Sequence, residues 1–182
     1  MRKLKVSEIR DFKPCKDAWE FFLKHTDKKM NDKISVLEVL NIIDSPDYKR
    51  NAADDILWLL QKMRQKHIKG ARYILLTALA DIMEHVLPAF EEKHPDNKRP
   101  RKAIEAIRLF RDRKISKKKL IATTAYADAA AYAATTAYAD AHVYAAAYAD
   151  TATYVAAYVA AFDADATAER EWQIEHLREL LK

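Results

Sequence analysis

The stretch from Ile121 to Asp165 constrains the fold more than any other part of this 182-residue chain. It contains no Lys, Arg, Glu, Gly or Pro, yet it holds seven of the nine tyrosines. Because alanine loses no side-chain entropy in a helix, we expect this Ala-rich stretch to be helical. A single straight helix of this length would run roughly 68 Å, whereas a chain of this size forms a globule about 40 Å across. The stretch is therefore expected to break into several central helices or to protrude.

Ala-Tyr-Ala-Asp units recur within this stretch, and each internal Asp is followed four residues later by a Tyr. Residues four apart share one face of a helix. The resulting columns pair Asp128 with Tyr132, Asp140 with Tyr144 and Tyr148, and Asp150 with Tyr154 and Tyr158. Two interpretations follow. Tyr rings can fill the gaps between Ala-faced helices, with each hydroxyl bonded to an Asp, or the same side chains can line a cavity that binds a planar ligand.

The rest of the chain has the periodicity of amphipathic helices. Residues from about 15 to 25 place aromatic and aliphatic side chains at helical spacing, and Ser35 to Glu38 has the form of a capping box. A helix is expected over about 50–69, with Gly70 at its C-terminal end. In the helix that follows, Pro88 is expected to produce a kink or an end.

A last amphipathic helix follows Asp165, and Trp172 is expected to anchor it in the core. No stretch predicts a convincing β-strand. The sequence therefore predicts an all-α fold, a compact multi-helix bundle with Ala/Tyr-rich central helices. Two parts are expected, an N-terminal helical subdomain over residues 1–49 and a helical domain over residues 50–182.

The net charge of +5 is unevenly distributed. Residues 1–120 carry 29 Lys and Arg against 18 Asp and Glu, whereas 121–165 carries five Asp and no basic residue. The basic residues are scattered among acidic ones, and no helix-turn-helix or zinc-finger signature accompanies them, which argues against nucleic acid as the partner. Arg99, Arg101 and Lys102 surround Pro100 at a predicted helix start, where an anion can bind. The alternative for these three is an ordinary solvated helix start.

The chain has few features of an enzyme. It has one glycine and no Gly-rich phosphate loop or nucleophile elbow. Its six histidines are dispersed, and His142 lies about 200° around a helix from Asp140, so those two cannot hold one metal. We therefore expect no catalytic activity, no metal site and no cofactor.

The single cysteine, Cys15, cannot form an internal disulfide, and no long apolar run or cleavable leader is present. These features favour a reducing environment and argue against a membrane-spanning segment or secretion. A cytoplasmic location is the expectation.

The run from His85 to Ala106, HVLPAFEEKHPDNKRPRKAIEA, resembles the central motif of the fifth putative immunity protein family. The Ala-rich helices with Ala141-His142-Val143, and the closing Glu169-Arg170-Glu171-Trp172-Gln173, are similar to the rest of that family's pattern. The resemblance covers about residues 50–182. It implies an all-helical protein from bacteria or their phages that is classed as an immunity protein and neutralises a toxin.

Two binding functions follow from these observations. In the first, the protein belongs to a conflict system of bacteria and phages and neutralises a toxin or defence effector protein by binding it. In the alternative, it is a phage-type sponge that sequesters a nucleotide-like immune signal in the Tyr/Asp-lined pocket, with Arg99, Arg101 and Lys102 serving its phosphates. Neither requires a membrane, and the sequence leaves homo-oligomerisation open.

Overall fold

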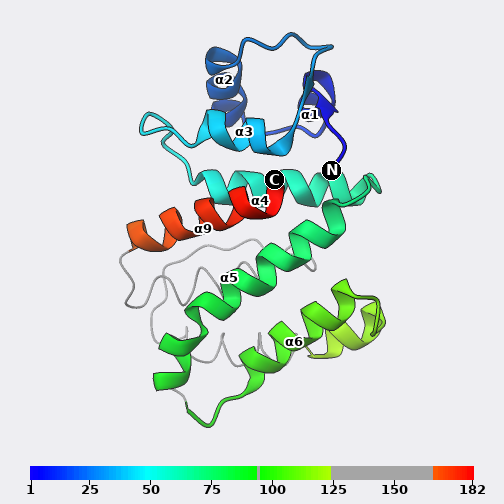
Figure 1. The fold of residues 1–182 in the computed structure, drawn as a ribbon, viewed down its shortest axis with the longest axis vertical. Helices are drawn as coiled ribbons and strands as arrows, with labels where there is room; N and C mark the ends of the chain where they lie inside the picture. The colour runs from blue at the N-terminus through cyan, green and yellow to red at the C-terminus, as the bar shows by residue number, and fades with distance from the viewer. Residues whose placement is uncertain (94, 124–165) are drawn as a thin grey trace. The chain divides into compact units, whose positions relative to one another are not determined.

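The computed structural model describes residues 1–93, 95–123 and 166–182, and these residues are predominantly helical (Figure 1). The all-α prediction is confirmed. The helices are α1 (Val6–Asp11), α2 (Lys16–His25), α3 (Val36–Ile43), α4 (Ala52–Gln65), α5 (Ala71–Lys93), α6 (Arg99–Arg111) and α9 (Ala166–Leu181).

A small antiparallel sheet, absent from the sequence-based expectation, joins two distant segments. Strand β1 (Leu4–Lys5) pairs with β2 (Lys33–Ile34), with Leu4 opposite Ile34. Both of these side chains are 1 % exposed. Each strand has only two residues, too few to show the alternation of polar and apolar residues from which strands are recognised.

The chain forms two compact units. Unit 1 contains residues 1–75 and 170–182, and unit 2 contains residues 76–169. This division differs from the expected boundary after residue 49, and an N-terminal subdomain ending there stays a prediction.

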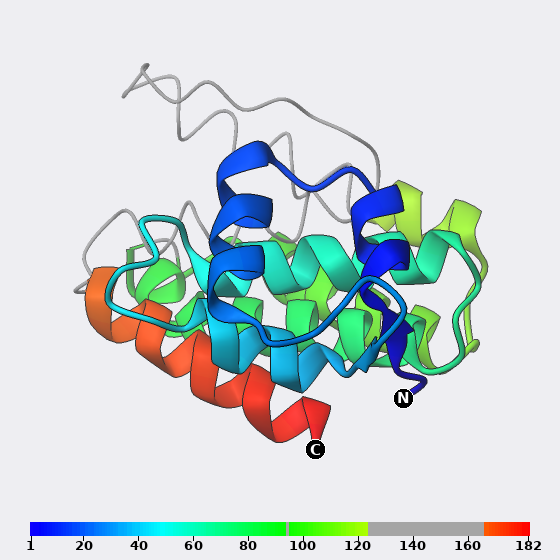
Figure 2. The same ribbon diagram turned by 90° about the horizontal axis from the view of Figure 1, so that it is seen from above.

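In unit 1, helix α3 contacts both α2 and α4 and lies between them in Figure 1. Figure 2 shows α9 running beside α3, where Arg178 of α9 donates a hydrogen bond to Asn41 at 3.4 Å and forms an ion pair with Asp44. The core of this unit is aliphatic, and its fully buried side chains include Val6, Leu40, Ile56, Leu60, Met63 and Leu177.

The start of α3 confirms the predicted capping box. The Ser35 hydroxyl accepts a hydrogen bond from the Glu38 backbone N–H at 3.1 Å, and the Glu38 carboxylate accepts one from the Ser35 backbone N–H at 2.8 Å. Two backbone groups that a helix start leaves without partners are thereby satisfied.

The prediction that Gly70 ends the helix over 50–69 is wrong. Helix α4 ends at Gln65, and His67 takes the left-handed conformation with φ 56°. The His67 N–H donates to the Arg64 carbonyl and the Ile68 N–H to the Met63 carbonyl, the pattern of a Schellman motif. Gly70, with φ 90°, instead precedes the first residue of α5. Local hydrogen bonding therefore lets a non-glycine residue occupy the position that usually favours glycine.

In unit 2, α5 continues through Pro88 to Lys93, so the proline does not end the helix. Arg108 of α6 bridges two carboxylates of α5, Asp81 at 3.0 Å and Glu84 at 2.5 Å. Apolar side chains of both helices form the core of this unit: Leu79, Ile82, Met83, Val86, Leu87, Ala103, Ile104 and Ile107 are buried.

Helix α9 does not bury Trp172 as deeply as a core anchor would be buried. Leu177 is 0 % and Gln173 8 % exposed, whereas Trp172 is only partly buried and stacks on His176 with ring centroids 5.0 Å apart. Trp172 is therefore a peripheral packing residue. None of the described helices is both long and apolar enough to cross a membrane.

Candidate functional site

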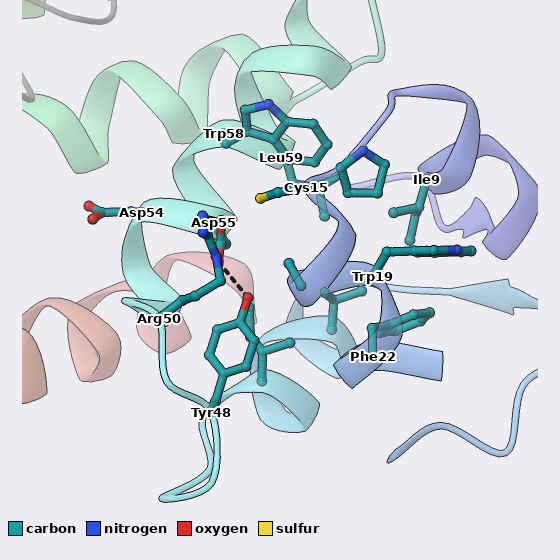
Figure 3. A pocket seen from close by; sticks show the side chains of 14 residues that line it. Ile9, Cys15, Trp19, Phe22, Tyr48, Arg50, Asp54, Asp55, Trp58 and Leu59 are labelled. Carbon is teal, nitrogen blue, oxygen red and sulfur yellow. Dashed lines mark hydrogen bonds and ion pairs between the residues drawn. The ribbon is translucent and has the colours of Figure 1, made fainter. Parts of the chain in front are cut away.

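A pocket of about 270 Å³ opens in unit 1 among residues of α1 to α4 and the loops between them (Figure 3). Its floor is apolar and buried because the same side chains also form the core of this unit. The floor residues are Ile9, Phe22, Val39, Ile43 and Leu59, all between 2 % and 7 % exposed.

Two tryptophans form much of the pocket wall. Trp19 and Trp58 are each partly exposed, and Trp19 stacks on Phe22 with ring centroids 5.6 Å apart. The Lys62 ammonium lies 5.7 Å from the Trp58 ring centroid, within cation–π distance. The pocket therefore combines aromatic walls with an apolar floor.

One end of the pocket is polar and centred on the Asp55 carboxylate. The Tyr48 hydroxyl donates to Asp55 Oδ2 at 2.5 Å. Arg50 donates from Nε to Oδ2 and from Nη2 to Oδ1, both at 3.0 Å, which is the two-pronged geometry of a strong guanidinium–carboxylate pair. Figure 3 shows these groups converging. Asp55 is thus satisfied by the protein itself.

The same network holds both donors in their protonated forms. Burial, followed by the hydrogen bond to Asp55, raises the pKa of the Tyr48 hydroxyl well above its ordinary value. The hydrogen bonds to Asp55 raise the pKa of the Arg50 guanidinium. This end of the pocket therefore keeps one set of donors and acceptors throughout the neutral pH range.

Four further residues complete the lining: Pro14, Cys15, Ala18 and Asp54. Cys15 is exposed and precedes α2, while Asp54 points away from Asp55 in Figure 3. Among the described residues, no three His, Cys, Asp or Glu side chains are grouped in a way that could hold a metal ion.

A second candidate feature lies in unit 2. Residues 98–119, which we call the basic segment, carry eleven Lys and Arg against two Asp and Glu. Among the described ion pairs, Arg101 pairs with Glu91, Arg108 with Asp81 and Glu84, and Arg111 with Asp112. The exposed cations are Lys98, Arg99, Arg101, Lys102, Arg113, Lys114, Lys117, Lys118 and Lys119.

The three predicted anion-binding residues fall in this segment but differ in their surroundings. Arg101 forms a two-pronged pair with Glu91, at 2.9 and 2.5 Å. Arg99 and Lys102 are exposed and three residues apart at the start of α6, so they share one face of the helix. The structure thus commits Arg101 to Glu91, while anion binding by Arg99 and Lys102 stays a prediction.

The predicted Tyr/Asp ligand face lies outside the described residues. Its members are Asp128, Tyr132, Asp140, Tyr144, Tyr148, Asp150, Tyr154 and Tyr158. The choice between a packed core and a ligand cavity for these side chains stays a prediction.

Two parts of the motif noted in the sequence meet within unit 2. His85 Nε2 lies 3.3 Å from the Glu169 carboxylate, whose side chain is only 4 % exposed. The start of the central motif and the start of the closing motif are therefore in contact.

A comparison with protein families shows to which family this chain belongs. The model of the Imm-5 like putative immunity protein family matches residues 65–180. The chain belongs to this family. Neither the curated proteins nor the solved structures contain a match.

The family match includes the whole basic segment, whereas the pocket is lined by residues from Ile9 to Leu59 and lies before it. Sequence reasoning missed the pocket because its lining comes from several separate elements. The available signal was the grouping of Trp19, Tyr48 and Trp58 with Arg50 and an Asp-Asp pair in one short N-terminal part of the chain.

Proposed function

We propose that the protein is a non-catalytic immunity protein that neutralises a toxin or defence effector by binding an acidic surface of it through the basic segment. The observation that carries the proposal is the excess of positive charge within the family-matched part of the chain. The basic segment has a net charge of +9, and the three α5 carboxylates that pair with it, Asp81, Glu84 and Glu91, leave +6.

The distribution of this charge supports protein recognition. Arg101 and Arg108 are held against α5, so part of the basic surface has a fixed geometry. The exposed lysines around them provide a long-range field, which accelerates encounter with an oppositely charged partner and discriminates against cationic ones. Such binding weakens as salt increases.

The experiment compares the full-length protein with a Lys98→Glu, Arg99→Glu and Lys102→Glu triple variant. These three side chains are exposed and have no role in the buried core, so the fold should be retained. The matched control reverses three exposed lysines of unit 1, Lys24, Lys49 and Lys66. Each immobilised protein is used to capture partners from cells that carry the system.

The wild type and the control are expected to retain one acidic protein in stoichiometric amount, with at least about tenfold weaker retention by the basic-segment variant. Raising the salt from about 50 to 300 mM should weaken retention by the wild type. The captured protein should be toxic when expressed alone and harmless when co-expressed with the wild type. Equal retention by all three proteins, or a captured protein that stays toxic, contradicts the proposal.

A further inference from the structure

We propose that the pocket of unit 1 binds a small, neutral, planar aromatic molecule of about two fused rings that carries a hydrogen-bond acceptor. This binding site is separate from the basic segment. It lies outside the family-matched residues, so it adds a ligand to the protein without depending on the proposed toxin binding.

The volume sets the size of the ligand. An apolar cavity of about 150 Å³ holds one benzene molecule, and the pocket measures about 270 Å³. A fused pair of six-membered rings with one small substituent fits this volume, whereas a nucleotide with its sugar and phosphates does not.

The walls select a planar apolar body. Trp19 and Trp58 are only partly buried. Phe22 stacks on Trp19 and Lys62 lies over the ring of Trp58, so a flat partner would add to each ring on the side that these neighbours do not cover. Aromatic rings prefer offset-stacked or edge-to-face contacts with one another. The floor residues Phe22 and Leu59 are 4 % and 2 % exposed. A ring that reaches them leaves water, which is the main source of binding free energy for an apolar group.

The polar end selects an acceptor on the ligand. Asp55 already accepts hydrogen bonds from Tyr48 and Arg50, and its side chain is 14 % exposed, against 40 % for Arg50. The pair to Asp55 uses Nε and Nη2 of Arg50, which leaves Nη1 as a further donor. An incoming carbonyl oxygen can therefore bond to Arg50 without displacing an existing partner.

The charge at this end argues for a neutral ligand. At this end Arg50 and Asp55 neutralise each other, so an anion finds no uncompensated positive charge between them. A cation finds Asp55 already bonded to Tyr48 and Arg50, and Asp54 pointing away. A neutral amide or ketone carries no charge, so it avoids the cost of desolvating either an anion or a cation.

The test uses the full-length protein and three probes with the same rings: 2-naphthamide, 2-naphthoate and 2-naphthylmethylammonium. Calorimetry is expected to show saturable binding of 2-naphthamide at one site with a Kd below about 1 mM, and weaker binding of both charged probes. Absence of saturable 2-naphthamide binding overturns the proposal. Tighter binding of either charged probe overturns the assigned ligand class.

Cys15 provides a readout of location that needs no substitution. It is the only cysteine, it lines the pocket and it is exposed, so a thiol-specific reagent should modify it. Saturating 2-naphthamide is expected to slow this reaction at least about threefold, because the bound rings cover the thiol. An unchanged rate with full binding places the probe elsewhere and overturns the assignment.

A pair of variants tests the same location independently. Ala18 lines the pocket from α2, whereas Glu20, two residues later on the same helix, is exposed and outside it. Ala18→Phe is expected to weaken 2-naphthamide binding at least about tenfold by filling the pocket, and Glu20→Phe should leave it unchanged. Equal affinity in both variants, with helical content retained by circular dichroism, contradicts the proposal.

Discussion

In the pocket of unit 1, one carboxylate, Asp55, is bonded to both Tyr48 and Arg50, so its charge is balanced by the protein itself. In the basic segment of unit 2, eleven cations face two acidic residues of the same segment, and most of them are exposed. The first arrangement presents shape and apolar surface to a ligand, and the second presents an unbalanced field. The two regions therefore differ in how a partner can be recognised and in what salt and pH do to them.

The largest effect on stability is expected where the paired charge of the pocket is broken. Asp55→Asn removes the charge that holds Tyr48 and Arg50, and it should lower the free energy of unfolding by about 2 kcal/mol. The matched change Asp47→Asn, at an exposed loop position, should alter it by less than about 0.5 kcal/mol. Urea unfolding of both variants measures the difference. Equal stabilities would show that the Asp55 network does not stabilise unit 1.

A smaller effect on stability is expected within the basic segment, where a cation held in ion pairs can be compared with an exposed one. Arg108 is 33 % exposed and bridges Asp81 and Glu84. Arg108→Gln should therefore cost about 1 kcal/mol, in the range of a partly exposed ion-pair network. Lys102→Gln, at an exposed position of the same helix, should change stability by less than about 0.5 kcal/mol. If both variants lose the same amount, pairing does not distinguish these cations.

Local features of this fold could be predicted from the sequence, and those that depend on distant contacts could not. The capping box at Ser35 needs only four consecutive residues, and α2 follows from apolar spacing after Pro14. The end of α4 was misplaced because Gly70 is the usual signal, whereas packing and hydrogen bonding fixed the turn at His67. The β1–β2 pairing joins Leu4 to Ile34 and has no local signature.

The site shows the same division. A basic helix start at Arg99 to Lys102 is visible in the sequence, but the commitment of Arg101 to Glu91 depends on how α6 lies against α5. The pocket required Ile9, Tyr48 and Leu59 to be brought together from different elements. Composition drew attention to the tyrosines beyond residue 123, whereas the aromatic residues that line the described pocket lie in the first 58 residues.

The smallest effect is expected at Glu38. The Glu38 carboxylate is held by backbone hydrogen bonds, and it can be compared with the Glu84 carboxylate, which is held by an ion pair. The Ser35 backbone N–H, followed by the Ser35 hydroxyl, lowers the pKa of Glu38 to about 2, from an ordinary value of 4.5. The Arg108 guanidinium lowers the pKa of Glu84 through its hydrogen bond and its charge. Both side chains are more than one-third exposed, at 37 % and 48 %, so their contributions are small.

The sign of the pH dependence follows from the depressed pKa of Glu38. Its contribution to stability is fully present above pH 4.5 and is lost as the pH falls towards about 2. Glu38→Ala, which removes the acceptor of the capping box, should therefore be less stable than the wild type by about 0.5 kcal/mol at neutral pH, the lower end of the cost of a lost helix cap. The difference should shrink steadily below pH 4.5 in urea titrations.

Because the stability difference at Glu38 rests mainly on hydrogen bonds, it should change little between about 50 and 500 mM salt, whereas the cost of Arg108→Gln should fall over that range. A Glu38 difference that disappears in salt would show that Glu38 acts through Lys3 and Lys28 and not through the cap of α3. A difference that is constant in acid would show that the charge of Glu38 contributes nothing to stability.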